Sequence, residues 1–325
     1  MKNNQIGIIG TGYWGTNIIN ALFKIGCKNI HCLDNNIKNL KEIKKKFPKI
    51  SVHKKLSEFL ENKFDGIVIA TNTKSHYQIA KACLKKNNNI FVEKPVTNDS
   101  SKLIKLINLA KVKKKIIMSG YIYYYNQHIE FIKKILNKKG LGKVLYVSFE
   151  RLNLGPVRND ISSAWDLSSH DISICNYFFK KKIKLVSSSG CDILKEKIND
   201  ISLISAKVGD IKVDFKSSWL NPEKVRKIVI VGKKKMLLYN EIDFKNPIKI
   251  YNKYASYPNV GKFSKKFFTQ KANIYYGSTI SPKVKSNSPL ENEMREFLKC
   301  CKGKKTPKTS AEISLKILNI LEKLK

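Results

Sequence analysis

Short apolar runs alternate with helical patterns along the first 120 residues of the chain. Ile6–Ile9, Ile30–Leu33, Ile67–Ala70, Ile90–Val92 and Ile116–Ser119 are apolar runs of strand length, and helical spacing of apolar positions fills the intervals between them. A strand, a helix and a second strand at this spacing pair in parallel. The pattern therefore predicts an α/β fold in which residues 1–120 form a doubly wound parallel sheet.

The pattern changes after Gly120. Strand-like stretches follow one another at 201–208, 211–218, 225–231 and 236–239, and a further strand is expected at 144–151. Gly209-Asp210 separates two of these stretches and is typical of a two-residue hairpin turn, which joins antiparallel strands. With helices expected near 126–137 and 166–179, the second half is predicted to be α+β with a mainly antiparallel open sheet.

Two further regions complete the predicted organisation. Residues 251–288 are lysine-rich and contain several prolines, so we expect an irregular surface segment there. Helices are expected near 290–301 and 311–324. The predicted domains are 1–120, a Rossmann domain, and 121–325, an α+β domain for substrate and oligomer contacts whose C-terminal helices could pack back on the first domain.

Composition changes this picture little. The formal charge of +38 would suit a nucleic-acid binder, but only four of the 63 basic residues are arginine and the lysines are spread along the whole chain. An AT-rich genome explains such a bias, so no nucleic-acid partner is expected. The seven cysteines form no C-x-x-C pair, which predicts reduced thiols and no metal site. Without a membrane-length apolar run or a signal peptide, a cytoplasmic location is expected.

A glycine-rich motif follows the first predicted strand and opens a helix. Its glycines have the G-x-G-x-x-G spacing of dinucleotide-binding loops, in which backbone N–H groups face a pyrophosphate at a helix N-terminus. A methyltransferase also has a glycine-rich loop after its first strand, but this full spacing favours a dinucleotide. The residues predicted to bind the cofactor here are Gly10, Gly12, Tyr13, Trp14 and Gly15.

Asp34 ends the second predicted strand, about twenty residues after the glycines. A carboxylate there accepts hydrogen bonds from ribose hydroxyls and repels a 2′-phosphate. The following Asn35 and Asn36 offer no arginine to a phosphate, so NAD(H) is predicted over NADP(H). The alternative is that Asp34 only caps the next turn.

Three further motifs resemble those of the glucose-fructose oxidoreductase/inositol dehydrogenase (Gfo/Idh/MocA) family. They are the segment from Ala70 to His76, the Glu93-Lys94-Pro95 run, and Asp166-x-x-x-His170. The likeness covers essentially the whole chain, and the combination of the last two motifs is its most specific part. Asn72 departs from the family pattern, which usually has proline at that position.

The resemblance implies the roles of three catalytic residues. His170 is the expected general acid/base, Lys94 would hydrogen-bond the reacting oxygen, and Asp166 would bind a neighbouring hydroxyl or orient the base. These side chains suit the oxidation of a secondary alcohol, because the hydroxyl proton needs a base of near-neutral pKa while hydride leaves for the nicotinamide. Asp166 and His170 are four residues apart, so on a helix they share a face.

The resemblance also implies the remaining walls of the cofactor site. Thr71 and Asn72 should line the passage between adenosine and nicotinamide, and Glu93 should lie near the nicotinamide ribose. Trp14 could close over the nicotinamide or pack against the second domain. His76 opens a helix beside the cofactor, and the alternative is that it only fixes that loop.

The stretch from Glu150 to Asp166 carries the substrate prediction. Arg151 and Arg158 lie there, two of only four arginines, and arginine suits a carboxylate or phosphate better than lysine does. With Trp165 they are predicted to bind an anionic substrate, and the alternative is that both arginines form structural ion pairs. The segment also resembles family members of surface-polysaccharide sugar synthesis.

The sequence thus predicts an NAD(H)-dependent dehydrogenase acting on a ring carbon of a sugar or nucleotide sugar. The alternatives are a cyclitol or polyol dehydrogenase of the inositol type, and a catalytically silent NAD-binding regulatory protein. The intact Lys94, Asp166 and His170 argue against the silent protein. By analogy with related proteins we expect a homo-oligomer, a dimer or tetramer, and no membrane partner.

Overall fold

The computed structural model describes residues 4–256 and 272–324 and divides the chain into two compact units. The first unit comprises Met1–Asn126 and Asn287–Glu322, and the second comprises Gln127–Ser286 with Lys323–Lys325. The two helices near the C-terminus therefore belong to the first unit.

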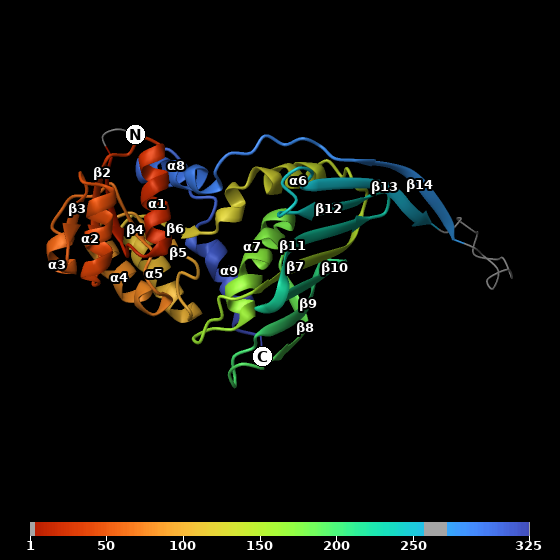
Figure 1. The fold of residues 1–325 in the computed structure, drawn as a ribbon, viewed down its shortest axis with the longest axis horizontal. Helices are drawn as coiled ribbons and strands as arrows, with labels where there is room; N and C mark the ends of the chain where they lie inside the picture. Colours follow the sequence, from red (N-terminus) through yellow and green to blue (C-terminus); the bar gives the residue numbers. More distant parts are fainter. Residues whose placement is uncertain (1–3, 257–271, 325) are drawn as a thin grey trace. The chain divides into compact units, whose positions relative to one another are not determined.

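The first unit is built on a parallel sheet of six strands in the order β3-β2-β1-β4-β5-β6 (Figure 1). The strands are β1 (Gln5–Ile9), β2 (Asn29–Leu33), β3 (Ser51–His53), β4 (Gly66–Ile69), β5 (Ile90–Glu93) and β6 (Ile117–Gly120). The strand order reverses between β1 and β4, the place where ligands bind in doubly wound sheets. The predicted parallel sheet is confirmed.

Helices connect and cover these strands. They are α1 (Tyr13–Lys24), α2 (Ile37–Lys46), α3 (Leu56–Phe59), α4 (Thr73–Lys85), α5 (Ser100–Val112), the short 3₁₀ helix η1 (Ile122–Tyr125), α8 (Pro289–Cys301) and α9 (Ala311–Leu321). The added C-terminal helices extend both helical layers, because α8 packs against α1 and α9 packs against α5. The strands β1, β4 and β5 are almost completely buried between these layers, as their continuous apolar runs require.

The second unit contains an eight-stranded sheet in the order β14-β13-β12-β11-β7-β10-β9-β8. The strands are β7 (Val144–Leu154), β8 (Lys184–Cys191), β9 (Ile201–Val208), β10 (Ile211–Ser218), β11 (Leu220–Gly232), β12 (Met236–Asn240), β13 (Ile248–Ser256) and β14 (Asn273–Ile280). All neighbours are antiparallel except β7 and β10, so the predicted mainly antiparallel sheet is confirmed. Gly209 turns between β9 and β10 at φ +62°, as the hairpin prediction requires.

One face of this sheet is covered by α6 (Gln127–Asn137) and α7 (Ser169–Phe179) (Figure 1). A π-helical turn, η2 (Ala164–Ser168), leads directly into α7. Alternate side chains of β7 and β10 point into the core, where the Phe149 and Phe215 rings stack with centroids 5.0 Å apart. Most positions of α7 are buried, as expected of a helix that packs against the sheet.

The segment predicted to be irregular, 251–288, contains strand structure. Its first residues complete β13, and β14 follows within it and pairs with β13. Residues 257–271 of this segment lie outside the described part of the chain. All residues of β14 are exposed, so the strand has no buried face and no alternation of apolar and polar positions that could have revealed it.

All seven cysteines are free thiols. Within residues 4–256 and 272–324, no helix has the length and apolar character needed to span a bilayer.

Candidate functional site

The glycine loop between β1 and α1 has the geometry of a phosphate cradle. Gly10 adopts φ +92°, and a Cβ there would lie 2.7 Å from the carbonyl oxygen of Ala70. A Cβ on Gly15 would lie 2.0 Å from the Gly10 carbonyl oxygen, so the helix can approach the strand only through glycine. Gly12 is the N-cap of α1, and a Cβ built on it meets nothing within 4 Å. Open space before a helix N-terminus is what a dinucleotide pyrophosphate needs, so the loop fits this group. Tyr13, at 83% exposure, borders the space.

Asp34 follows β2 and is tied to this loop by hydrogen bonds. Thr11 donates from its N and Oγ1 to Asp34 Oδ2 at 2.7 and 2.9 Å, Asn39 Nδ2 donates to the same oxygen, and Asn36 N donates to Oδ1 at 2.8 Å. Burial raises the pKa of Asp34, but these hydrogen bonds outweigh burial and hold the pKa below its ordinary value. The carboxylate is thus ionised at neutral pH, and its Oδ1 keeps acceptor capacity for a ligand hydroxyl.

Trp14, Glu93 and Lys94 form a second connection across the sheet edge. The Trp14 indole Nε1 donates to Glu93 Oε1, and the Lys94 backbone N donates to Glu93 Oε2 at 3.3 Å. A Cβ on Gly120 would lie 2.7 Å from Glu93 Oε2, so the glycine at the end of β6 leaves room for this carboxyl group. Burial raises the pKa of Glu93 to about 7, although the bonds from Trp14 and Lys94 N lower it. The glycine loop is thereby joined to the residue beside Lys94.

Thr71, Asn72 and His76 surround the start of α4, which follows β4. Asn72 is the N-cap, and its side chain accepts a hydrogen bond from Ser75 N at 3.2 Å, while Thr71 Oγ1 lies 2.8 Å from Ser75 Oγ. His76 is buried, and its Nδ1 and Nε2 lie 2.9 and 3.0 Å from the carbonyl oxygens of Pro95 and Thr71. The structure therefore directs the His76 ring to backbone groups.

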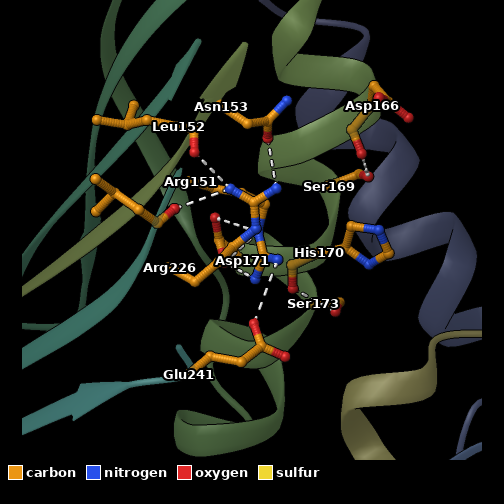
Figure 2. A network of polar contacts seen from close by, with 11 residues as sticks. Arg151, Leu152, Asn153, Asp166, Ser169, His170, Asp171, Ser173, Arg226 and Glu241 are labelled. Carbon is orange, nitrogen blue, oxygen red and sulfur yellow. Dashed lines mark hydrogen bonds and ion pairs between the residues drawn. The ribbon is translucent and has the colours of Figure 1, made fainter. Parts of the chain in front are cut away.

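Asp166 and His170 lie on the continuous helical stretch formed by η2 and α7 in the second unit. Asp166 belongs to the π-helical turn and His170 to the first turn of α7. Figure 2 shows both on the same side of the helix, and Ser169 Oγ donates to the Asp166 carbonyl oxygen at 3.1 Å. π-Helical turns frequently occur at functional sites. The second unit thus presents a carboxylate and an imidazole together.

Arg151 of β7 lies behind this pair, in a buried ion pair with Asp171 (Figure 2). Arg151 Nε donates to both Asp171 carboxylate oxygens at 3.1 Å, Nη2 donates to Oδ1 at 2.7 Å, and Nη1 lies 3.9 Å from Glu241 Oε2. Burial raises the pKa of Asp171, and the Arg151 guanidinium opposes this shift. The guanidinium predicted to bind substrate is thus directed to a carboxylate of its own chain.

Arg226 of β11 stands directly opposite Arg151 in the sheet register. Its Nη1 donates to the carbonyl oxygens of Leu152 and Val225 at 2.8 Å each, and its Nη2 donates to Asn153 Oδ1. Two arginines opposite one another would repel, and Asp171 with Glu241 supplies the compensating charge. Arg226 also fixes the end of β7, from which the predicted substrate segment departs.

Arg158 and Trp165 occupy that segment. Arg158 Nε and Nη2 donate to the two Asp160 carboxylate oxygens at 3.0 and 2.9 Å, and Nη1 lies 3.7 Å from Asp166 Oδ1. About a third of the Arg158 side chain is exposed, in contrast to Arg151. Trp165 is partly exposed beside Asp166 in η2. Of the two arginines, Arg158 is therefore the one that a ligand can reach.

The predicted site residues fall into two groups, one in each unit. The first unit brings together the glycine loop, Asp34, Glu93 and Lys94 at the carboxyl ends of its strands, and the second brings together Asp166, His170 and Arg158. Sequence reasoning missed the groups that hold these residues: Thr11, Asp171, Arg226 and Glu241. The only signal for Asp171 was its place next to His170, and Arg226 was marked by the rarity of arginine.

Residues 4–121 match the model of the Gfo/Idh/MocA oxidoreductase family, described as having an NAD-binding Rossmann fold. Myo-inositol 2-dehydrogenase of Thermotoga maritima is 22% identical over 231 residues, which are 66% of this chain and 66% of that enzyme. The alignments to the curated relatives span between 34% and 66% of the relatives' own length.

Solved structures share the fold over nearly the whole chain. UDP-N-acetylglucosamine 3-dehydrogenase from Acidithiobacillus ferrooxidans superposes with a TM-score of 0.79 at 17% identity, covering 99% of this chain and 96% of that one. The WlbA dehydrogenase from Bordetella pertussis, solved with NADH and UDP-GlcNAcA, gives a TM-score of 0.78 at 14% identity, covering 98% and 94%. Structures of this fold have been solved with NAD, NADH or NADP.

Proposed function

We propose that this chain, whose residues 4–121 match the model of the Gfo/Idh/MocA oxidoreductase family, is an NAD(H)-dependent dehydrogenase that acts on a ring carbon of a sugar or nucleotide sugar. One observation carries the proposal. Trp14 in the glycine loop donates to Glu93, which also accepts from the backbone N of Lys94. The residue that would touch the reacting oxygen is thus connected directly to the loop that would hold the cofactor.

Different residues of the first unit would hold different parts of NAD(H). The N-terminus of α1 at Gly12 would hold the pyrophosphate, and Asp34 Oδ1 would accept a hydrogen bond from an adenosine ribose hydroxyl. The ionised Asp34 would repel a 2′-phosphate, which supports the preference for NAD(H) over NADP(H). When bound, the nicotinamide supplies the hydride acceptor or donor.

The chain's own groups then handle the proton and the developing charge. His170 accepts the hydroxyl proton during oxidation and returns it during reduction. The Lys94 ammonium donates a hydrogen bond to the reacting oxygen and stabilises negative charge there. Asp166 accepts a hydrogen bond from a neighbouring hydroxyl group and fixes the position of the ring.

Arg158 supports an anionic substrate, and Trp165 offers an apolar surface beside it. Arg158 is partly exposed and lies 3.7 Å from Asp166, so an anion bound by this guanidinium would place its sugar close to the catalytic pair. The diphosphate of a nucleotide sugar or the carboxylate of a uronic acid supplies such an anion. We assign Arg151 a supporting role, because its guanidinium is buried against Asp171.

We also propose a homo-oligomer, a dimer or tetramer, working in the cytoplasm. Large apolar side chains of β9 and β14 are exposed, namely Leu203, Ile274 and Tyr276, and exposed apolar surface often marks contact sites. Seven free thiols suit a reducing compartment. Light scattering of the purified protein measures the subunit number, and a monomer at micromolar concentration would contradict the oligomer.

The proposed function is tested by following NADH absorbance at 340 nm while the protein is incubated with each of a panel of nucleotide sugars, free sugars and cyclitols. We expect turnover with a nucleotide sugar, and loss of turnover in Lys94→Ala and His170→Ala. The matched control is Lys63→Ala, which removes an exposed lysine of the first unit. Turnover of a cyclitol alone would favour the polyol alternative, which the inositol dehydrogenase relative supports. Cofactor binding without any turnover would favour the silent regulatory protein.

A further inference from the structure

His76 occupies an unusual position for a predicted cofactor residue. It lies in the first turn of α4 with 1% of its surface exposed, so its ring is closed off from ligands. Nδ1 lies 2.9 Å from the Pro95 carbonyl oxygen, and Nε2 lies 3.0 Å from the Thr71 carbonyl oxygen. Both ring nitrogens thus meet backbone acceptors.

The two acceptors belong to different loops of the proposed site. Thr71 follows β4, and Pro95 follows β5 directly after Lys94. These strands are parallel neighbours, so their carboxyl ends lie side by side at the same edge of the sheet. One buried ring therefore joins the loop proposed to line the cofactor passage with the loop that carries the proposed catalytic lysine.

The hydrogen-bonding groups of the ring can connect the two loops, which packing alone would not do. A neutral imidazole has one N–H and an imidazolium has two, while both partners here are acceptors only. The neutral ring donates to one carbonyl at a time, and the charged ring donates to both. Burial lowers the pKa of His76 below its ordinary value, although the two carbonyl groups oppose this shift, so the neutral ring is the favoured form. An aliphatic side chain could fill the same volume but would bind neither loop.

We propose that His76 is a positioning residue that couples the cofactor loop at Thr71 and Asn72 to the loop of Lys94 and Pro95. Its Nε2 faces the Thr71 carbonyl oxygen of the cofactor loop and its Nδ1 faces the carbonyl oxygen of Pro95, the residue after Lys94, and the neutral ring donates to one of the two at a time. The inference rests on the proposed function for the roles of both loops, and it gives His76 no direct contact with cofactor or substrate.

Two replacements by amide side chains test the contacts of the two ring nitrogens separately. The asparagine amide reaches the place of Nδ1, so His76→Asn keeps a donor for Pro95 and loses the one for Thr71. The glutamine amide reaches the place of Nε2, so His76→Gln keeps a donor for Thr71 and loses the one for Pro95. The matched controls are His53→Asn and His53→Gln, at a histidine of β3.

The expected result is a split between kcat and cofactor affinity. His76→Gln should lower kcat about tenfold with the Kd for NADH within about twofold of wild type, because only the lysine loop is released. His76→Asn should raise the Kd for NADH about tenfold with kcat at saturating NADH nearly unchanged. The two variants should have similar Tm values, and the His53 variants should show neither effect. Equal losses of kcat and affinity in both variants, in proportion to Tm, would overturn the proposal and leave His76 a core residue.

A readout without turnover separates this inference from the proposed function. The rate at which an amine-reactive acetylating reagent modifies Lys94, followed by mass spectrometry, should change in His76→Gln and stay at the wild-type value in His76→Asn. If the wild type turns over no compound, the proposed function fails while this labelling split still supports the coupling. If labelling of Lys94 is the same in wild type and both variants, the coupling itself is refuted.

Discussion

Removing the Arg151 guanidinium should destabilise the second unit strongly. In Arg151→Met the aliphatic stem is largely retained, but Asp171 loses three donor contacts of 2.7 to 3.1 Å and becomes a buried carboxylate without its main counter-charge. The side chains of Arg151 and Asp171 are only 7% and 3% exposed, so water replaces little of this interaction. The perturbation is therefore electrostatic more than it is a loss of packing.

The expected magnitude follows from this burial. Breaking a buried ion pair by removing one partner costs about 3–5 kcal/mol, because the remaining charge is uncompensated. Arg226, directly opposite Arg151 in the sheet, supplies part of the missing charge and favours the lower end, about 3 kcal/mol. For a unit of this size, that loss corresponds to a decrease in Tm of roughly 6–12 °C.

The loss should also depend on pH with a definite sign. Burial raises the pKa of Asp171 and Arg151 lowers it, so the variant removes the main opposition to this shift and leaves only the weaker effect of Arg226. A carboxyl group whose folded pKa exceeds its unfolded pKa binds more protons when folded, and stability then falls as pH rises between the two values. Arg151→Met should thus be closest to wild type near pH 4 and lose most at neutral pH and above.

Urea unfolding followed by circular dichroism at several pH values measures the free energy of unfolding. The matched control is Arg295→Met, because Arg295 forms a long, partly exposed ion pair with Glu291 within α8 and should change stability by less than about 1 kcal/mol. The double variant Arg151→Met/Asp171→Leu should recover most of the loss, because a buried pair replaced by apolar groups leaves no lone charge. Wild-type stability in Arg151→Met, together with a raised substrate KM, would refute this reasoning and favour the direct substrate role that the sequence suggested.

Three further predictions concern the proposed site. Because the pKa of Glu93 is raised to about 7 and Trp14 donates to it, Trp14 fluorescence should titrate near pH 7, and Glu93→Gln should abolish the transition; a titration that persists in that variant would contradict the link. Asp34→Asn should lower the ratio of the NADP(H) dissociation constant to the NAD(H) dissociation constant about tenfold, because the charge that repels the 2′-phosphate is gone. Fluorescence titration measures both constants, and an unchanged ratio would leave Asp34 as a turn residue. Arg158→Lys should raise KM for an anionic substrate about tenfold with kcat little changed, because lysine lacks the planar fork; an unchanged KM would remove Arg158 from substrate binding.

The first unit was predictable from sequence because its signals are local. The apolar runs of β1, β4 and β5 are continuous and buried on both faces, and the glycine spacing fixes a single turn. The outer strands of the second sheet carry no such signal. β8 and β14 are mostly exposed along their length, so neither shows the alternation that marks a half-buried strand.

The support of the second unit's site could not be predicted for a different reason. Whether Arg151 points to a ligand or to Asp171 depends on how α7 docks on β7, and the partnership of Arg151 with Arg226 depends on the register of β7 and β11. Register and docking are set by contacts between segments 20 to 75 residues apart in the chain. The sequence marked Arg151 as special, but both readings of it, ligand contact and structural pair, were equally consistent with the local pattern.

The distribution of arginine gives the sequence clue a physical basis. Three of the four arginines in the chain lie at the candidate site of the second unit, where each uses its planar fork: Arg151 on Asp171, Arg158 on Asp160, and Arg226 on backbone and amide oxygens. Lysine, abundant everywhere else, has one rotatable ammonium group and cannot reproduce two parallel bonds from a single plane. In a chain whose composition drives basic positions toward lysine, an arginine indicates a place where geometry outweighs charge. Such a residue identifies the neighbourhood of a site, while only the fold decides whether it binds the ligand or holds the residues that do.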